Sequence, residues 1–177
     1  MVIGIIIVVI LIIIVVGIYN SLVAKSKAVE KAKATIDVYL TQRFSLIPNL
    51  VEVVKGYAKY EKETLEGLVK IREGYSSGNL KIEEEASLNS NLNNLIMKVE
   101  SYPELKANEN YLELQKSLSK MESQLQAARR IYNMDVETYN VAINKFPNSI
   151  FASIFNFKEA RFFEATAVEK ENLNVSL

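Results

Sequence analysis

Residues 1–19 read MVIGIIIVVILIIIVVGIY and contain no charged side chain. As an α-helix this run extends about 28 Å, close to the hydrocarbon core of a bilayer, which is roughly 30 Å thick. We therefore expect a transmembrane anchor over residues 1–24, with the body of the protein after it. The side chains expected to face lipid include Val2, Ile7, Leu11, Val15 and Ile18.

Two other interpretations of an apolar N-terminal run fit less well. A cleaved signal peptide has a positively charged start, an apolar core of about 7–15 residues and a small-residue cleavage site. Here no basic side chain precedes the run, the run is longer than such a core, and no cleavage pattern follows it directly. A buried helix of a soluble protein needs a large body to cover a surface that is apolar on all sides.

Basic residues follow the apolar run, and none precede it. Four lysines lie within fifteen residues of Tyr19, namely Lys25, Lys27, Lys31 and Lys33. Because segments rich in Lys and Arg stay on the cytoplasmic side, we expect a single-pass protein of the cell membrane. Its N-terminus lies outside and its body lies in the cytoplasm, a reducing compartment that suits a chain without cysteine.

The composition excludes most catalytic machinery. The chain has 21 basic and 21 acidic residues, so no net charge attracts nucleic acid, and it has no His, Cys or Trp. Ser–His–Asp and Cys–His catalysis are ruled out, as are zinc sites built from His or Cys. No glycine-rich phosphate loop is present. The run Glu83 to Glu85 is interpreted as a solvated helix face or first turn, with a cation site as the alternative. We therefore expect no enzyme, no cofactor, no metal and no nucleic-acid partner.

The body, residues 25–146, has the apolar spacing of long amphipathic helices. The first helix continues from the anchor to about Phe44, and a second runs from near Ile47 to a loop at residues 76–79. A third is expected over residues 82–100 and a fourth over 103–144, where apolar residues repeat every seven positions. Short loops join antiparallel neighbours. We therefore predict an all-α protein in which the transmembrane helix continues into an elongated antiparallel up-down four-helix bundle.

Five charged residues fall on the apolar stripes of these helices. They are Arg43, Glu61, Arg72, Glu122 and Arg129. An isolated buried charge costs on the order of several kcal/mol, whereas paired charges can set the register of neighbouring helices. We interpret the five as a buried polar network. An internal ion-binding site and a solvated position are the alternatives.

The C-terminal segment, residues 147–177, is rich in phenylalanine and is expected to begin with a short apolar helix. Five of the seven phenylalanines lie between Phe151 and Phe163. The segment can fold back onto the bundle, lie in the membrane interface or dock on a neighbouring copy. Because its apolar part carries only two basic residues, protein contact is favoured over lipid. The predicted self-association residues are Ile150, Phe151, Ile154, Phe155, Phe162 and Phe163.

Three stretches together resemble the LemA family. Residues 37–65, DVYLTQRFSLIPNLVEVVKGYAKYEKETL, are similar to its R-x-x-L-I-P-N-L-V region and the following Y-A-x-x-E turn. Residues 100–147 resemble its Y-P-x-L-K-A and A-R-R-x-Y-N segments, and FNFKEARFFEA at residues 155–165 resembles its ending. Tyr60 departs from the family pattern, in which a His is often expected. The matching motif residues are Arg43, Leu46, Pro48, Asn49, Glu61, Arg72, Pro103, Arg129, Tyr132 and Asn133.

The resemblance implies a membrane-anchored antiparallel helical bundle without an established reaction. It also implies relatives associated with membrane invagination in magnetosome-forming bacteria. We therefore expect a non-enzymatic protein that forms a membrane-associated homo-oligomer and organises or shapes the membrane, with the lipid bilayer and further copies of the chain as its partners. The alternative is a membrane-tethered adaptor or signalling module, which would bind a helix of an unidentified protein partner in a groove of the bundle.

Overall fold

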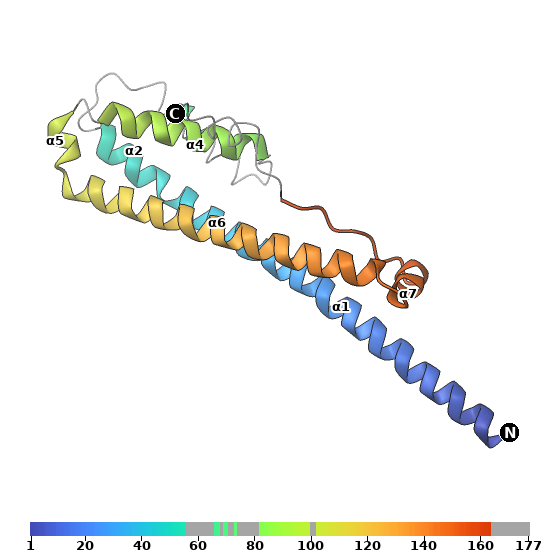
Figure 1. Cartoon of the computed structure of the whole chain (residues 1–177). Coiled ribbons are helices and arrows are strands. Elements are labelled where there is room, and N and C mark those ends of the chain that lie inside the picture. Colours follow the sequence, from blue (N-terminus) through green and yellow to red (C-terminus); the bar gives the residue numbers. More distant parts are fainter. Residues whose placement is uncertain (56–65, 68, 71–72, 74–81, 100–101, 164–177) are drawn as a thin grey trace, which may run out of the picture. The chain divides into compact units, whose positions relative to one another are not determined.

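The computed structural model describes residues 1–55, 66–67, 69–70, 73, 82–99 and 102–163 (Figure 1). All the secondary-structure elements in this part of the chain are helices, which confirms the predicted all-α class. Their bounds are α1 Val2–Ser45, α2 Ile47–Lys55, α4 Ile82–Val99, α5 Pro103–Lys106, α6 Glu109–Asn144 and α7 Asn148–Ile154.

The chain divides into two compact units. The first, here called the anchor unit, contains residues 1–37 and 126–163, and the second unit is formed by the described residues of the range 38–125. The helices α1 and α6 each contribute turns to both units.

Helix α1 is one unbroken helix of 44 residues, as the lack of any Gly or Pro between Tyr19 and Ser45 predicts. Among the described residues there is one candidate membrane span, Val2–Lys55, which covers α1 and α2, and no part of its most apolar 18-residue window is buried. Of the predicted lipid-facing side chains, Val2, Ile7 and Leu11 are exposed, whereas Val15 and Ile18 are half-buried. The exposed window is therefore apolar on every side, as lipid requires.

The anchor unit has a core built from α1, α6 and α7. Its buried residues are Leu22, Tyr139, Ala142, Ile143 and Ala152. Around them pack the half-buried side chains Ile18, Val29, Phe157 and Ala160. The core thus begins just where the uncharged run of α1 ends.

The second unit has its own apolar core. Its buried side chains come from the end of α1, from α2, α4 and α5, and from the start of α6. They are Leu40, Phe44, Ile47, Leu50, Val51, Val54, Leu92, Leu95, Val99, Leu105, Tyr111, Leu118 and Leu125.

The predicted fourth helix differs from the observed one. It was expected to run without interruption over residues 103–144, but the structure divides it into α5 and α6. The division falls at Asn108, whose Oδ1 accepts a hydrogen bond of 3.0 Å from the backbone N–H of Tyr111. Asn108 thereby caps the N-terminus of α6, a role for which Asn is strongly preferred over continuation of a helix.

Helix α7 is short and ends in a left-handed turn. Asn156 has a φ of 58°, and the N–H of Phe157 donates to the carbonyl of Ala152 at 2.9 Å, as in a Schellman motif. After this turn the chain is extended. We call residues 157–163 the strap. A cis peptide bond joins Phe146 to Pro147 in the connection from α6 to α7.

Some predicted features lie outside the described residues. They are most of the second helix beyond Lys55, the loop at residues 76–79 and the tail from Glu164 onward. The four-helix, antiparallel arrangement of the bundle therefore stays a prediction.

Candidate functional site: a tyrosine–asparagine ladder on α6

The strap is fastened to α6 through its backbone. The Tyr139 hydroxyl donates to the carbonyl of Lys158 at 2.9 Å. The Asn140 amide donates to the carbonyl of Ala160 at 2.9 Å, and its Oδ1 accepts from the N–H of Ala160 at 2.9 Å. Asn140 thus satisfies both backbone groups of one residue.

The same arrangement recurs seven residues earlier on α6. The Tyr132 hydroxyl donates to the carbonyl of Arg161 at 2.9 Å. The Asn133 amide donates to the carbonyl of Phe163 at 3.0 Å, and its Oδ1 accepts from the N–H of Phe163 at 2.8 Å. We call Tyr132, Asn133, Tyr139 and Asn140 the ladder.

The two repeats match because seven residues of α6 and three residues of the strap cover nearly the same distance. Seven residues of α-helix rise about 10.5 Å, and positions seven apart share one face. Three residues of extended chain cover about 10 Å. Each step of seven along α6 therefore meets a step of three along the strap, which runs in the opposite direction.

Tyr139 is the buried member of the ladder. Burial raises the pKa of the Tyr139 phenol from its ordinary value of 10.0, so the hydroxyl stays protonated and remains a donor to Lys158. At the exposed end of the ladder, the Asn144 amide donates to Oε1 of Glu159 at 2.7 Å. Because most of these bonds reach main-chain atoms, the ladder recognises an extended backbone rather than a particular side chain.

Aromatic contacts hold both ends of the segment that contains the strap. The ring of Tyr19 lies edge-on to the rings of Phe155 and Phe157, with centroids 5.0 and 6.0 Å apart. At the other end, the Arg129 guanidinium lies 4.6 Å from the centroid of the Phe163 ring, in cation–π geometry. The segment therefore connects the end of the apolar run of α1 to the middle of α6.

The structure brings together two members of the predicted polar network. Nη1 of Arg43 lies 2.6 Å from Oε2 of Glu122 within the second unit, and the Arg43 side chain is almost fully buried. Arg129 belongs to the anchor unit, where it covers Phe163. Glu61 and Arg72 lie outside the described residues, so the network as a whole stays a prediction.

The predicted self-association residues lie on or beside α7 and the strap. Helix α7 folds back onto its own unit through Ala152, which was one of the expected alternatives. Phe151 and Phe163 are half-buried, whereas Ile150, Ile154, Phe155 and Phe162 are exposed. Their role in self-association stays a prediction.

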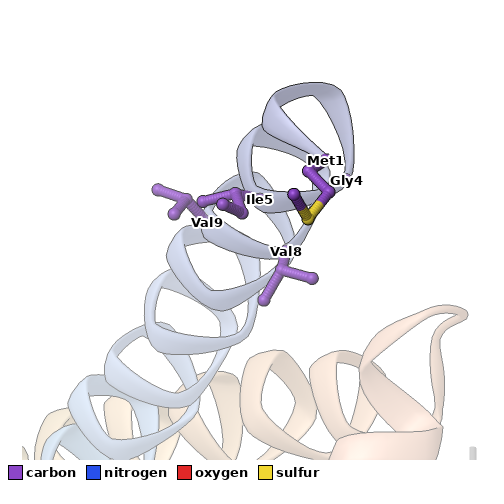
Figure 2. Close-up of a pocket in the computed structure, with 5 residues that line it drawn as sticks. All are labelled: Met1, Gly4, Ile5, Val8 and Val9. Carbon is purple, nitrogen blue, oxygen red and sulfur yellow. The ribbon is translucent and has the colours of Figure 1, made fainter.

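A shallow apolar pocket lies at the N-terminus of α1. Its lining residues are Met1, Gly4, Ile5, Val8 and Val9, and Figure 2 shows that all of them come from the first turns of this one helix. No charged or polar side chain enters it, so it offers no chemistry. Within the part of the chain that the structure describes, no group of His, Cys, Asp or Glu could hold a metal ion.

Sequence reasoning missed the role of the asparagines in the ladder. It noted Tyr132 and Asn133 as residues that match the family motifs, but it did not single out Asn140. The available signal was the dipeptide Tyr-Asn, which occurs at residues 132–133 and again at 139–140. A polar pair repeated at heptad spacing beside a buried stripe indicates a partner on the flank of the helix.

Comparisons with known proteins point to one family. The model of the LemA family matches residues 32–177, which include the ladder and the strap. The chain belongs to the LemA family. Protein LemA of Metamycoplasma hominis is 25% identical to this chain over 165 residues, which cover 91% of the chain and 75% of the relative.

Two further relatives are named as magnetosome proteins. MamQ of Magnetospirillum gryphiswaldense is 25% identical over 174 residues, and MamQ 2 of Paramagnetospirillum magneticum is 24% identical over 175 residues. Each alignment covers 82% of this chain but only 64% of the relative's length. The family, these relatives and the apolar N-terminal helix identify a membrane-associated helical protein.

Proposed function

We propose that this LemA-family protein is a non-enzymatic, single-pass membrane scaffold whose copies associate side by side and so organise the membrane that holds them. Its N-terminus lies outside and its body in the cytoplasm, since Lys25 and Lys27 follow the apolar run. The observation that carries the proposal is an exposed apolar stripe on α6.

The stripe lies on the face of α6 opposite its buried face. The exposed fractions of Ile131, Met134 and Val141 are 55%, 65% and 58%. With Thr138 they follow a 3-4-3 spacing, which is that of the a and d positions of a coiled coil. Met134 lies about 200° around the helix from Tyr132 on the core side. We call these four residues the outer seam.

Charges beside the outer seam favour parallel pairing. Two anchors inserted in the same membrane force α6 of two copies to run in the same direction. With Ile131 at an a position, Arg130 falls at g and Asp135 at e. In a parallel, in-register pair, the g residue of one helix faces the e residue five positions ahead on the other. Arg130 of one copy therefore faces Asp135 of the next.

The seam is too short to hold two soluble proteins together by itself. Complete burial of an Ile, Met or Val side chain is worth about 1.5–3 kcal/mol, and the ordering of both partners offsets much of this. Tethering in one membrane raises the effective concentration, so weak contacts suffice. Several relatives are named magnetosome proteins, which supports a role at a membrane surface.

The test uses the full-length protein in liposomes at several protein densities. Single-molecule photobleaching counts the copies per assembly, and electron cryomicroscopy of the same liposomes reports their shape. The test variant combines Ile131→Gln, Met134→Gln and Val141→Gln. The control variant combines Met97→Gln and Leu112→Gln, which remove exposed apolar side chains elsewhere.

We expect wild-type and control proteins to form assemblies that alter the liposomes, and the seam variant to remain monomeric. A wild-type protein that stays monomeric at every density would contradict the scaffold. If such a monomer instead holds a heterologous protein in stoichiometric amount, the adaptor alternative is correct.

A further inference from the structure

Helix α7 lies beside the end of the apolar run of α1. Within the anchor unit, Ala152 shares a core with Leu22, and the Phe155 ring contacts the Tyr19 ring. In Figure 1, α7 sits next to α1 at the end of α6, while the N-terminal turns of α1 extend past it without another described element alongside.

This contact sets the depth of α7 relative to a bilayer. Residues 1–19 span about 28 Å, so Tyr19 stands at the cytoplasmic edge of a hydrocarbon core that is roughly 30 Å thick. Tyrosine is enriched at that edge. Lys25, the first charged side chain, follows about 9 Å further along the helix. Whatever packs against Ile18, Tyr19 and Leu22 therefore lies in the interfacial layer.

The outward face of α7 is apolar. The exposed fractions of Ile150 and Ile154 are 51% and 67%, and that of Phe146, just before the helix, is 76%. Ile150 and Ile154 are four residues apart and share a face, whereas the buried Ala152 lies on the opposite side. Residues 146–157 carry no charged side chain.

Basic residues flank the uncharged residues 146–157. Lys145 precedes it and Lys158 follows it, and both side chains belong to exposed residues. An ammonium group on each side of an apolar element suits an interface in which apolar atoms reach the acyl chains and charges meet phosphates.

We propose that α7 is a second membrane contact, in which Phe146, Ile150 and Ile154 insert into the interfacial layer of the cytoplasmic leaflet. The partner is the lipid surface, because the docking of α7 on Tyr19 and Leu22 places these side chains at headgroup depth. The contact needs one copy of the chain only. It rests on the anchor in the proposed function, but not on self-association.

The chain has no cysteine, so single cysteine variants can carry a fluorophore at chosen depths. The test positions are Ile150→Cys and Ile154→Cys. Met97→Cys is the matched control, because the exposed fraction of Met97 is 68% and the residue lies in the second unit. Val9→Cys reports the hydrocarbon core.

Each labelled full-length protein is reconstituted at about one copy per vesicle, in vesicles of phosphatidylcholine and phosphatidylglycerol. Quenching by lipids brominated at the upper acyl carbons is compared with quenching by aqueous iodide. We expect bromolipid to remove most of the fluorescence at positions 150 and 154 and iodide to remove little. The label at position 97 should show the reverse.

Iodide quenching at positions 150 and 154 equal to that at position 97 overturns the membrane contact. Protection that appears only at high protein density, with coupling between labels of different copies, also overturns it and assigns α7 to a second copy. The Val9 label separates the two failures. If it is accessible to iodide, the anchor itself is wrong, whereas a lipid-quenched Val9 label with an exposed α7 refutes the second contact alone.

Discussion

Asn140 holds Ala160 by both of its backbone groups, donating to the carbonyl and accepting from the N–H at 2.9 Å each. Both atoms of the Asn140 amide are thereby used on one residue that lies twenty positions further along the chain. Asn133 makes the same pair of hydrogen bonds to the backbone of Phe163. The C-terminal strap is therefore held on α6 through its backbone, in addition to the side-chain contacts of Phe157 and Phe163.

The substitution Asn140→Ala should release the middle of the strap. It leaves a backbone donor and a backbone acceptor of Ala160 without their partner, at a cost of about 1–3 kcal/mol. Urea unfolding of the full-length protein in detergent measures the cost, and hydrogen exchange at the amide of Ala160 locates it.

Asn93→Ala on α4 controls for the higher helix propensity of alanine, because Asn93 is an exposed residue in the middle of its helix. Equal stabilities for the two variants, together with unchanged exchange at Ala160, would show that the ladder does not hold the strap.

Glu122 should matter more to stability than an exposed acid. Glu122→Gln removes the charge that faces the buried Arg43 at 2.6 Å. Because Glu122 is partly exposed, we expect a loss of about 1–3 kcal/mol, below that of a fully buried pair. Chemical denaturation provides the measurement.

The double variant Arg43→Met and Glu122→Met should recover stability, since no charge then remains without a partner. Glu30→Gln is the matched control, because its ion pair with Lys27 is also short, at 2.7 Å, but exposed. An additive double variant would argue against coupling between Arg43 and Glu122.

Alkaline pH should destabilise the protein through its buried tyrosines. Burial raises the pKa of Tyr139 and of Tyr111 above 10.0. The folded state then holds more protons than the unfolded state once the pH exceeds about 10, so stability falls from there up to the folded pKa. Thermal melts between pH 8 and pH 11 in the wild type and in Tyr139→Phe test this.

The fall in stability should be shallower in Tyr139→Phe, and shallower still when Tyr111→Phe is added. Comparison of variants at each pH removes the contribution of the lysines. A wild-type profile that coincides with that of the double variant would contradict the linkage.

Association through the outer seam should depend on the charge of Arg130 and Asp135. Arg130→Asp places two acids opposite each other in a parallel pair and should lower the assembled fraction in liposomes. Adding Asp135→Arg reverses the polarity and should restore it. Photobleaching counts provide the measurement, and failure of the double variant to recover would exclude this register.

The sequence predicted the helical elements well because their signals are local. The uncharged run and the absence of Gly and Pro indicated the unbroken α1, and Pro48 marked the start of α2. The break before α6 was missed because the sequence does not distinguish Asn108 from a polar residue inside a helix. Only the structure shows that its side chain accepts from the N–H of Tyr111 and so caps the N-terminus of α6.

The ladder was harder to predict because its partners lie in a segment 19 to 30 residues further along the chain. The exposed outer seam could be found only once the opposite face of α6 was known to be buried. The partners of Asn133 and Asn140 are backbone atoms, which look alike at every residue. The strap runs back along α6 after the left-handed turn at Asn156.

Because α1 is one unbroken helix, a tilt of its apolar run also moves its far end. From Tyr19 to Ser45 it continues for about 39 Å beyond the hydrocarbon edge, so a tilt of about 10° swings its far end by about 7 Å. An apolar span longer than the local bilayer is accommodated by such tilts. In the proposed topology, membrane thickness therefore sets the tilt of the part of α1 that lies beyond the bilayer.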